Sequence, residues 1–370
     1  MDRRTFLQAG AGVASAAVLT KTSLAGSLSN NKMKILVLGG RDYFGPTLLE
    51  FLIKSGHDVT HFNRGFTNPN LFKELTWIRG NREIADGSGL EILKTHLKQN
   101  TFDLVIDTWQ KLPSAVYETA KLLKPYIGQY QYVSSISAYK DKSTKGIDEN
   151  YPMLDLSSSK LEDRRMSYSQ AKAWSETALF NELGDKAITF RSHGMRSNRL
   201  PERIYEPYWP VRMLDGDKIL LPKDDNHVMQ VCDVVSMVHF MGHAAQEKLS
   251  GIYNVALKTM LFKEYINRVD NVTKQPHEKV WIPKAFLKEH GIEPYQDLPL
   301  WRPQLPGFYH INTDKATKAG FKGRSIEAMV TDQIQGYLSR NPNNDFMFGV
   351  RGTISRQKEK LVLSAWENHK

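Results

Sequence analysis

The stretch MKILVLGG, residues 33–40, constrains the fold of this chain more than any other segment. It is a continuous apolar run that ends in two glycines, a pattern typical of a strand buried on both faces of a parallel sheet. The following TLLEFLIKSG has helical periodicity and a glycine, Gly56, that ends the helix. A buried strand, a glycine-rich turn and a helix are the first unit of a fold in which strands and helices alternate.

The alternation continues to about residue 198. We expect further strands in DVTHFNRG, FDLVIDTW, YQYVSSISAY and AITFRSHG, and helices in AVYETAKLLKP and YSQAKAWSETALFNEL. This order predicts an α/β fold, a Rossmann-type doubly wound parallel sheet formed by residues 32–198. Residues 199–370 are rich in Pro, Trp and Tyr, so we expect a smaller, irregular C-terminal substrate-binding region, with residues 227–256 returning to the first domain.

Residues 1–31 differ from the rest of the chain. Arg3 and Arg4 precede Phe6 and Leu7, and a short stretch rich in Ala and Gly follows before SLAG at residues 23–26. A spanning helix needs about 20 apolar residues, so this stretch is too short. The order of parts resembles a twin-arginine export signal, which a receptor reads as an address. The resemblance implies a signal peptide and linker, the twin-arginine translocation machinery as a partner, and a periplasmic mature protein without stable membrane insertion.

Charge and cysteine content restrict the function further. The net charge is +10, of which the first 31 residues contribute +2. No long run of Lys or Arg occurs, so the charge favours a basic face near an anionic substrate over nucleic-acid binding. Cys232 is the single cysteine, which excludes an intramolecular disulfide. His57 and His61 bracket an expected strand, where they would be about 13 Å apart. We predict no metal.

The turn GGRDYFG follows the first strand and predicts a dinucleotide site. Gly39 and Gly45 occupy the positions of the first and last glycines of the dinucleotide-binding pattern, while Asp42 replaces the middle one. The second expected strand ends in Asn63-Arg64, and Arg41 lies in the turn. Two guanidinium groups without a carboxylate favour the 2′-phosphate of NADP, although Asn63 also suits the adenosine ribose of NAD.

Two pairs of tyrosine and lysine are spaced four residues apart on expected helices: Tyr117/Lys121 and Tyr168/Lys172. Residues four apart share a helix face. Only the second pair follows a strand that ends in hydroxyl groups, VSSISAY, so it is the candidate for proton transfer on a carbinol oxygen.

ILVLGGRDYFG, VSSISAY and YSQAKAWSE resemble the extended short-chain dehydrogenase/reductase family, the NAD-dependent epimerase/dehydratase group. FNRG and RGNRE fit the strand ends of the same family, and GIYNVA and LPLWRP resemble the C-terminal parts of its less typical members, so the resemblance covers nearly all of the chain after residue 31. It implies that Ser135, Tyr168 and Lys172 are catalytic and that Asn81 stands where the family usually has an adenine-binding Asp. We expect the dinucleotide to contact Gly39, Gly40, Arg41, Tyr43, Phe44, Gly45, Asn63, Arg64, Asn81, Arg82, Thr108, Tyr168 and Lys172.

The chemistry follows from the side chains. Tyr168 can exchange a proton with a carbinol oxygen only if its pKa, ordinarily near 10, is lowered, and a nearby Lys172 ammonium favours this. Ser135 would position the reacting oxygen by a hydrogen bond. Aromatic and basic side chains are candidates for substrate contact, with a structural role left open for each: Trp109, Arg191, His193, Trp209 and Trp301.

Three functions remain open at this stage. The first is redox-neutral, epimerase- or dehydratase-like chemistry on a sugar carbinol with a retained dinucleotide. The second is a periplasmic dehydrogenase or reductase with an exchangeable cofactor. The third is a binding protein on the same fold, because a fold does not fix a function. We favour the first, because an exported enzyme cannot depend on a supply of free dinucleotide.

Overall fold

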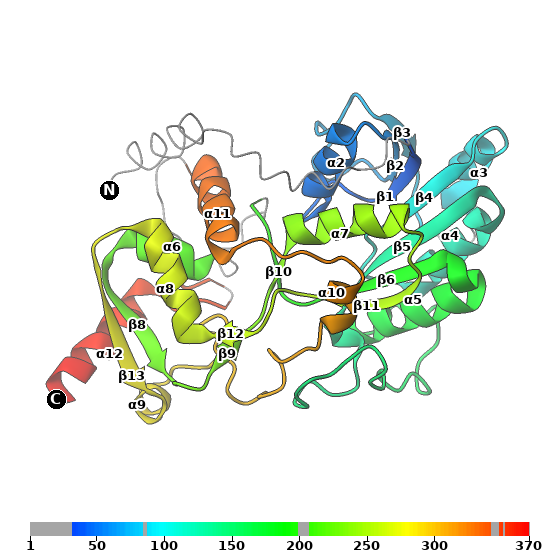
Figure 1. Cartoon of the computed structure of the whole chain (residues 1–370). Helices are drawn as coiled ribbons and strands as arrows, with labels where there is room; N and C mark the ends of the chain where they lie inside the picture. Colours follow the sequence, from blue (N-terminus) through cyan, green and yellow to red (C-terminus); the bar gives the residue numbers. More distant parts are fainter. Residues whose placement is uncertain (1–31, 84–86, 199–206, 342–347, 351, 370) are drawn as a thin grey trace.

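The computed structural model describes residues 32–83, 87–198, 207–341, 348–350 and 352–369 (Figure 1). The expected export signal therefore lies outside the described residues. Within these ranges, no helix is long and apolar enough to cross a membrane.

A parallel sheet of seven strands forms the centre of the first part of the molecule, in the order β11-β6-β5-β4-β1-β2-β3. Every neighbouring pair in it is parallel. Its strands are β1 (Lys34–Leu38), β2 (Asp58–Asn63), β3 (Thr76–Arg79), β4 (Phe102–Asp107), β5 (Ile127–Ser135), β6 (Ala187–Ser192) and β11 (Gly251–Val255). The predicted Rossmann-type sheet is confirmed, and residues 227–256 supply its edge strand β11 and the helix α7.

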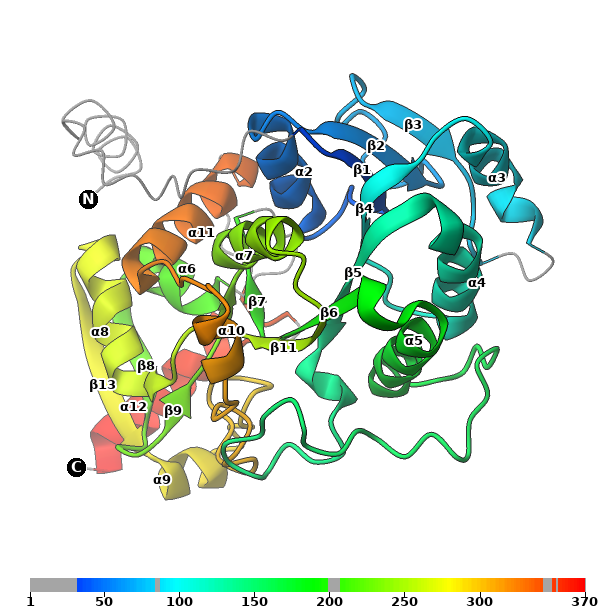
Figure 2. The ribbon, with the colours of Figure 1, turned by 45° about the vertical axis from the view of Figure 1, so that its right-hand side comes forward.

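Helices cover both faces of the sheet (Figure 2). One face carries α2 (Gly45–Lys54) and α7 (Val234–Gln246), and the other carries α3 (Glu91–Leu97), α4 (Pro113–Leu123) and α5 (Tyr168–Leu183). Because successive strand residues point to opposite faces, Ile35 and Val37 of β1 join the first core, whereas Leu36 and Leu38 join the second. This explains the unbroken apolar run of the first strand.

The C-terminal region contains more regular structure than we expected. A parallel pair, β8 (Asp217–Lys223) and β13 (His277–Pro283), is accompanied by α6 (Tyr208–Asp215), α8 (Phe262–Thr273), α9 (Lys284–Glu289), α11 (Ile326–Arg340) and α12 (Arg356–His369). Shorter elements are β7 (Met195–Arg196), β9 (Val228–Met229), β10 (Cys232–Asp233), β12 (Met260–Leu261) and α10 (Asp314–Lys318). Pro222 and Pro283 hid the strand pattern in the sequence, because proline argues against a central strand. The structure accommodates both prolines because each strand of a two-stranded sheet is an edge strand.

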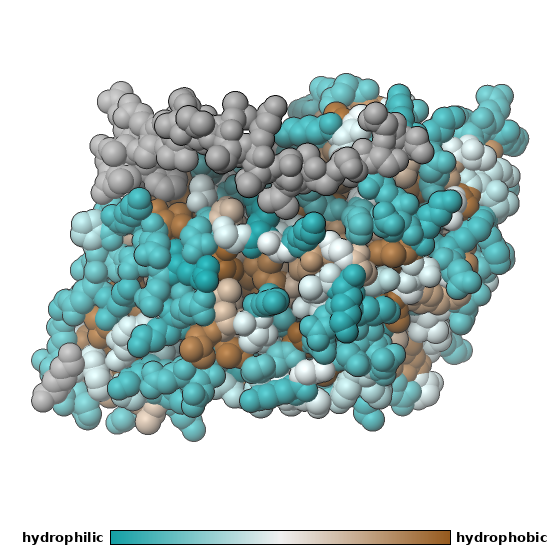
Figure 3. Space-filling view, in the orientation of Figure 1, coloured by the Kyte–Doolittle hydropathy of each residue, from teal (hydrophilic) through white to brown (hydrophobic). Residues whose placement is uncertain are grey.

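The surface in the orientation of Figure 1 is mostly hydrophilic, with hydrophobic side chains in small, scattered patches (Figure 3). The apolar side chains instead fill the buried core, which is continuous between the α2/α7 face of the sheet and the C-terminal region. Cys232 is fully buried within this core.

Candidate functional site

The glycine-rich turn after β1 brings the backbone close to the end of β4. Gly39 has φ +97°, and a Cβ there would overlap the Thr108 hydroxyl, which donates a hydrogen bond to the Leu38 carbonyl at 2.9 Å. A Cβ on Gly45 would lie 2.5 Å from the carbonyl carbon of Gly40. Both glycines are therefore required by close approach, as expected of a turn that leads from a buried strand into a helix.

Asp42 does not cap helix α2. Its carboxylate accepts the Tyr43 N–H at 2.8 Å and its carbonyl accepts the Gly45 N–H at 2.9 Å, while Phe44 occupies the cap position without a side-chain bond. Tyr43 has φ +55°, and its hydroxyl donates to the Met195 carbonyl at 3.2 Å. The Tyr43 side chain therefore links the turn after β1 to β7.

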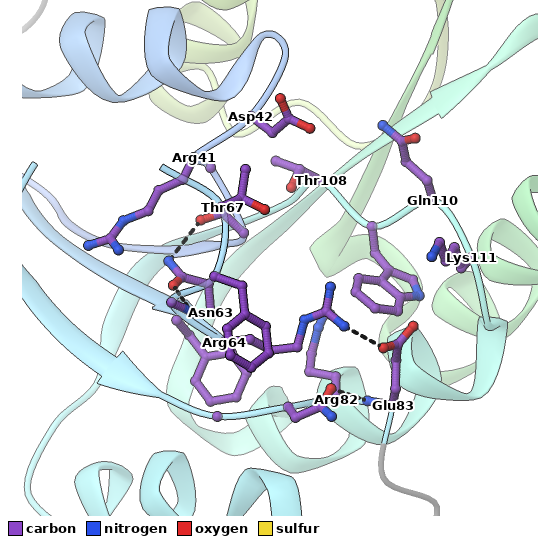
Figure 4. Close-up of a pocket in the computed structure, with 18 of the residues that line it drawn as sticks. Arg41, Asp42, Asn63, Arg64, Thr67, Arg82, Glu83, Thr108, Gln110 and Lys111 are labelled. Carbon is purple, nitrogen blue, oxygen red and sulfur yellow. Dashed lines mark hydrogen bonds and ion pairs between the residues drawn. The ribbon is translucent and has the colours of Figure 1, made fainter. Parts of the chain in front are cut away.

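A cavity of about 260 Å³ lies where β1, β2, β3 and β4 end (Figure 4). Ten of the expected dinucleotide contacts line it: Gly39, Gly40, Arg41, Tyr43, Phe44, Asn63, Arg64, Asn81, Arg82 and Thr108. Trp109, expected at the substrate, lines this cavity too. Gly45, Tyr168 and Lys172 do not. The sequence interpretation missed Phe66, Thr67, Glu83, Gln110 and Lys111, which come from loops without a recognisable motif.

The two arginines proposed for a 2′-phosphate are placed differently than expected. Arg41 is buried, its Nη2 lies 3.2 Å from His61 Nε2, and its guanidinium stacks 5.0 Å from the centre of the Trp77 ring. Burial, and then Arg41, lower the pKa of His61 to about 4, so the imidazole is neutral and accepts the hydrogen bond. Arg64 forms an ion pair with Glu83 at 2.7 Å. The premise of two guanidiniums without a carboxylate is therefore wrong.

Asn63 has a structural role in the turn. Its amide nitrogen donates to the Gly39 carbonyl at 3.3 Å, and its oxygen accepts the Gly65 N–H at 3.0 Å. The side chain therefore links the ends of β1 and β2. Asn81 likewise accepts the Glu83 N–H at 3.1 Å.

A buried ion pair forms the floor of the cavity. Asp107, fully buried at the end of β4, accepts hydrogen bonds from Arg82 at 2.6 and 2.8 Å and from the Tyr130 hydroxyl at 2.6 Å. The Arg82 guanidinium stacks 5.0 Å from the Trp109 ring centre. Burial alone would lower the pKa of Arg82, but Asp107 reverses this and raises it. Arg82 therefore lines the cavity with its charge already compensated.

Ser135 and Tyr168 meet at the junction of β5 and α5. Ser135 ends β5, and its hydroxyl accepts the Ser137 N–H at 3.1 Å. Tyr168 is the first residue of α5, directly after Ser167, which forms a capping box with Gln170. This cap fixes where the helix begins and so places Tyr168 against Ser135.

The expected lowering of the Tyr168 pKa is not observed. Although Tyr168 is 46% exposed, desolvation by the surrounding protein raises its pKa. The neighbouring Ser135 side chain acts in the opposite direction and lowers the pKa, but this is the smaller effect. In this structure Tyr168 is a protonated phenol at neutral pH, suited to donate a proton.

Lys172 lies one helical turn behind Tyr168 and is buried. Its Nζ donates to the carbonyls of Trp109 and Val133, both at 2.6 Å, and lies 5.8 Å from the Tyr168 ring centre. Burial lowers the pKa of Lys172 to about 7. Lys172 ties α5 to the ends of β4 and β5 by these two hydrogen bonds, and in its protonated form, with three N–H groups, it retains one donor.

A second cavity of about 380 Å³ adjoins Tyr43 and Ser135 on the side of the C-terminal region. His193 lines it and is 2% exposed. Its ring stacks on Tyr309 at 5.4 Å and meets the edge of Phe308 at 4.8 Å. Burial lowers the pKa of His193 to about 3, and its Nε2 has no hydrogen-bond partner among the described residues. His193 is thus a neutral, oriented imidazole at the wall of this cavity.

Three other expected substrate residues do not line either cavity. Arg191 is buried against Glu176, and Trp209 donates its indole N–H to the Pro299 carbonyl at 2.7 Å inside the core. Trp301 is also buried in the core. The structure therefore gives these residues the structural role that the sequence left open: Trp209 and Trp301 fill the core, as large aromatic side chains in a small domain often do, and Arg191 pairs with Glu176. The residues described also contain no group of three or more His, Cys, Asp or Glu side chains that could hold a metal ion.

No protein-family model matches the chain. A stretch of 130 residues is 32% identical to the chloroplast stem-loop binding protein of 41 kDa b of Arabidopsis thaliana, covering 32% of this chain and 33% of that protein. The chain thus spans about a third of the length of this curated relative.

Similar solved structures cover most of the chain. A dTDP-glucose 4,6-dehydratase from Bacillus anthracis, in complex with NAD, matches 84% of this chain and 98% of its own with a TM-score of 0.61 and 16% identity. A UDP-glucose 4-epimerase from Thermotoga maritima, with UDP-glucose, matches 84% and 100% with a TM-score of 0.60 and 15% identity. WbmG of Bordetella bronchiseptica, with NAD and UDP, matches 85% and 98% with a TM-score of 0.61 and 16% identity. The chain therefore shares the Rossmann-type α/β fold of these proteins.

Proposed function

We propose that this protein is a short-chain dehydrogenase/reductase-type enzyme that uses a nicotinamide dinucleotide to act on a carbinol of a sugar or sugar derivative. One observation carries the proposal. Ser135 lines the second cavity and lies close enough to Tyr168 to lower its pKa, while Lys172, behind Tyr168, donates a hydrogen bond to the carbonyl of Trp109 in the first cavity. A hydroxyl, a phenol and an amine therefore lie between the first and the second cavity.

The first cavity fits a dinucleotide. Its turn is closed around Gly39 and Gly45, where a Cβ would meet Thr108 or the Gly40 backbone, and helix α2 begins directly behind it, where its first N–H groups favour a phosphate. Gly39, Gly40, Tyr43 and Thr108 would hold the phosphates and adjacent ribose, and Lys172 would reach the second ribose with its remaining donor. A bound nicotinamide ring supplies a place from which hydride can leave or to which it can return.

The residues of the chain would supply the proton chemistry. Tyr168, protonated in this structure, would give its proton to the oxygen of a carbonyl and take it back from a carbinol when its pKa falls. The Lys172 ammonium would favour that fall by stabilising the phenolate. Ser135 would hold the reacting oxygen, and the neutral Nε2 of His193 would hydrogen-bond a neighbouring hydroxyl of the substrate in the second cavity.

We further propose that the reaction is redox-neutral and the dinucleotide retained. The N-terminal resemblance to an export signal supports this, because a protein exported folded would carry its dinucleotide with it, and bound ligand stabilises the folded form. The dehydratase and epimerases with similar folds carry sugar nucleotides in their names, which supports a carbohydrate substrate. A dehydrogenase with exchangeable cofactor remains the alternative.

The test is to denature the purified full-length protein and analyse the released small molecules by mass spectrometry, while native protein is supplied with sugars and sugar nucleotides without added cofactor. We expect stoichiometric dinucleotide and conversion of a sugar. If the purified protein holds no dinucleotide and converts substrate only with added NAD or NADP, the redox-neutral proposal is wrong and the enzyme carries out net oxidation or reduction.

A binding function is the second candidate, and the name of the partly similar chloroplast protein favours it. A protein that only binds a nucleic-acid stem-loop does not need a tyrosine that exchanges a proton. In that case Tyr168→Phe should leave stem-loop affinity unchanged. Tight stem-loop binding without dinucleotide or turnover would establish this candidate instead.

A further inference from the structure

The ion pair between Arg64 and Glu83 lies in the wall of the first cavity (Figure 4). Arg64 follows directly after the last residue of β2, the place where dinucleotide-binding folds meet the 2′ position of the adenosine ribose. Arg64 Nη1 lies 2.7 Å from Glu83 Oε2. A group at the 2′ position would therefore meet a carboxylate as well as a guanidinium.

The backbone of Glu83 is fixed on both sides. Its N–H donates to the Asn81 side chain at 3.1 Å, and its carbonyl accepts a hydrogen bond from Arg164 Nη2 at 2.8 Å. Arg164 belongs to the segment that leads into α5, so two separate parts of the chain hold Glu83 in position. These two backbone hydrogen bonds, together with the ion pair itself, keep the Glu83 carboxylate beside Arg64.

The other arginines of the cavity do not compensate for Glu83. Arg41 turns its guanidinium toward His61 and Trp77, away from Arg64 (Figure 4). Arg82 is neutralised by Asp107 beneath the floor. Lys111 lies beside Gln110 and, in the described part of the chain, forms no ion pair with Glu83 (Figure 4). The charge that a 2′ substituent meets is thus decided by the balance between Arg64 and Glu83.

We propose that Glu83 makes this cavity select NAD over NADP, an inference that rests on the proposed dinucleotide function. The carboxylate accepts a hydrogen bond from a 2′-hydroxyl, as acidic residues near this position do in NAD-binding folds. It also pairs with Arg64 and so competes with a phosphate for this guanidinium, and it repels the negative charge that a 2′-phosphate carries.

The experiment titrates the full-length protein, freed of bound dinucleotide with charcoal, with NAD and with NADP in a calorimeter. Four proteins are compared: the unchanged chain, Glu83→Gln, Glu83→Gln with Arg64→Ala, and Glu91→Gln. Glu91 pairs with Lys94 on the exposed surface of α3, so its substitution removes the same charge away from the cavity. Melting temperatures measured alongside show that each variant is folded.

We expect the unchanged chain and Glu91→Gln to bind NAD more tightly than NADP. Glu83→Gln should gain about tenfold in NADP affinity, the size of one charge-assisted hydrogen bond, and should bind NAD no more tightly than before. The added Arg64→Ala should abolish the gain.

Two results would overturn the inference while leaving the proposed function intact: an unchanged chain that prefers NADP, or equal effects of Glu83→Gln on both dinucleotides. Failure of the unchanged chain to bind either dinucleotide would overturn the proposed function together with the inference.

Discussion

The carboxylate of Glu176 accepts hydrogen bonds from the guanidinium of Arg191, with Nη2–Oε2 at 2.7 Å, and both side chains are 1% exposed. Glu176 lies two turns along α5 from Tyr168, and Arg191 lies in β6. The Ser134 hydroxyl also donates to Glu176, directly before Ser135 in β5. This network therefore sets the position of the helix that carries Tyr168 relative to the strand that carries Ser135.

Breaking this pair should destabilise the fold. Glu176→Gln leaves the buried Arg191 charge without its partner, and we expect a loss of about 3 kcal/mol in the free energy of unfolding, measured by urea denaturation. Glu182→Gln on the same helix is the matched control, because Glu182 pairs with Lys124 at the surface and should cost no more than about 1 kcal/mol. Equal losses in the two variants would refute a structural role for the buried pair.

The turn after β1 gives a second prediction. In Gly45→Ala the added Cβ would lie 2.5 Å from the Gly40 backbone, so the turn must shift and dinucleotide affinity should fall at least about tenfold. In Gly323→Ala the nearest atom is a methyl group of Leu257, also at 2.5 Å, which can rotate away. That control should retain its affinity in calorimetric titration, and a similar loss in both variants would contradict the requirement for glycine in the turn.

The buried His193 predicts a pH dependence of stability. Its pKa is lowered to about 3 in the folded protein, against about 6.5 in the unfolded chain. Above pH 6.5 neither state holds the proton. Between pH 6.5 and 3 the unfolded chain takes it up and the folded protein does not, so stability falls as the pH falls.

His193→Gln should remove this contribution, reducing the slope of unfolding free energy against pH by about 1.4 kcal/mol per pH unit near pH 5. Urea denaturation at several pH values measures it. An unchanged slope would mean that His193 is protonated in the folded protein. The same variant should also lower kcat/KM. The shape of the pH profile above pH 6.5 should not change, because the folded protein keeps His193 neutral throughout that range.

The fold could be predicted well because its signals are local. Three contiguous segments carry them: the apolar run of β1, the glycine turn and the helix α2. Because β1 is buried on both faces, its sequence is a continuous apolar run that can be recognised without the structure. The strands β8 and β13 were not recognised. Each contains a proline that interrupts the strand pattern, and the two strands are too far apart in sequence for a local pattern to indicate their pairing.

The site was predictable only in part, for the same reason. The turn glycines, Ser135 and Tyr168 come from motifs with fixed spacing. Glu83 and Asp107 act through partners on other strands, so no local pattern identifies them. His193 could be suggested by its place at the end of β6, but its neutral state depends on burial by Tyr309 and Phe308, which are remote in sequence.

The most direct measurement of the proposed chemistry is the turnover of Tyr168→Phe on whichever sugar the unchanged protein converts, together with the dinucleotide it binds. Removal of the phenol hydroxyl deletes the proton carrier alone, so turnover should fall at least about a hundredfold while dinucleotide affinity stays within a few-fold. Tyr117→Phe on α4, the other tyrosine spaced four residues before a lysine, should leave both unchanged. Turnover by Tyr168→Phe comparable to that of the unchanged protein would contradict the assignment of Tyr168 as the proton carrier.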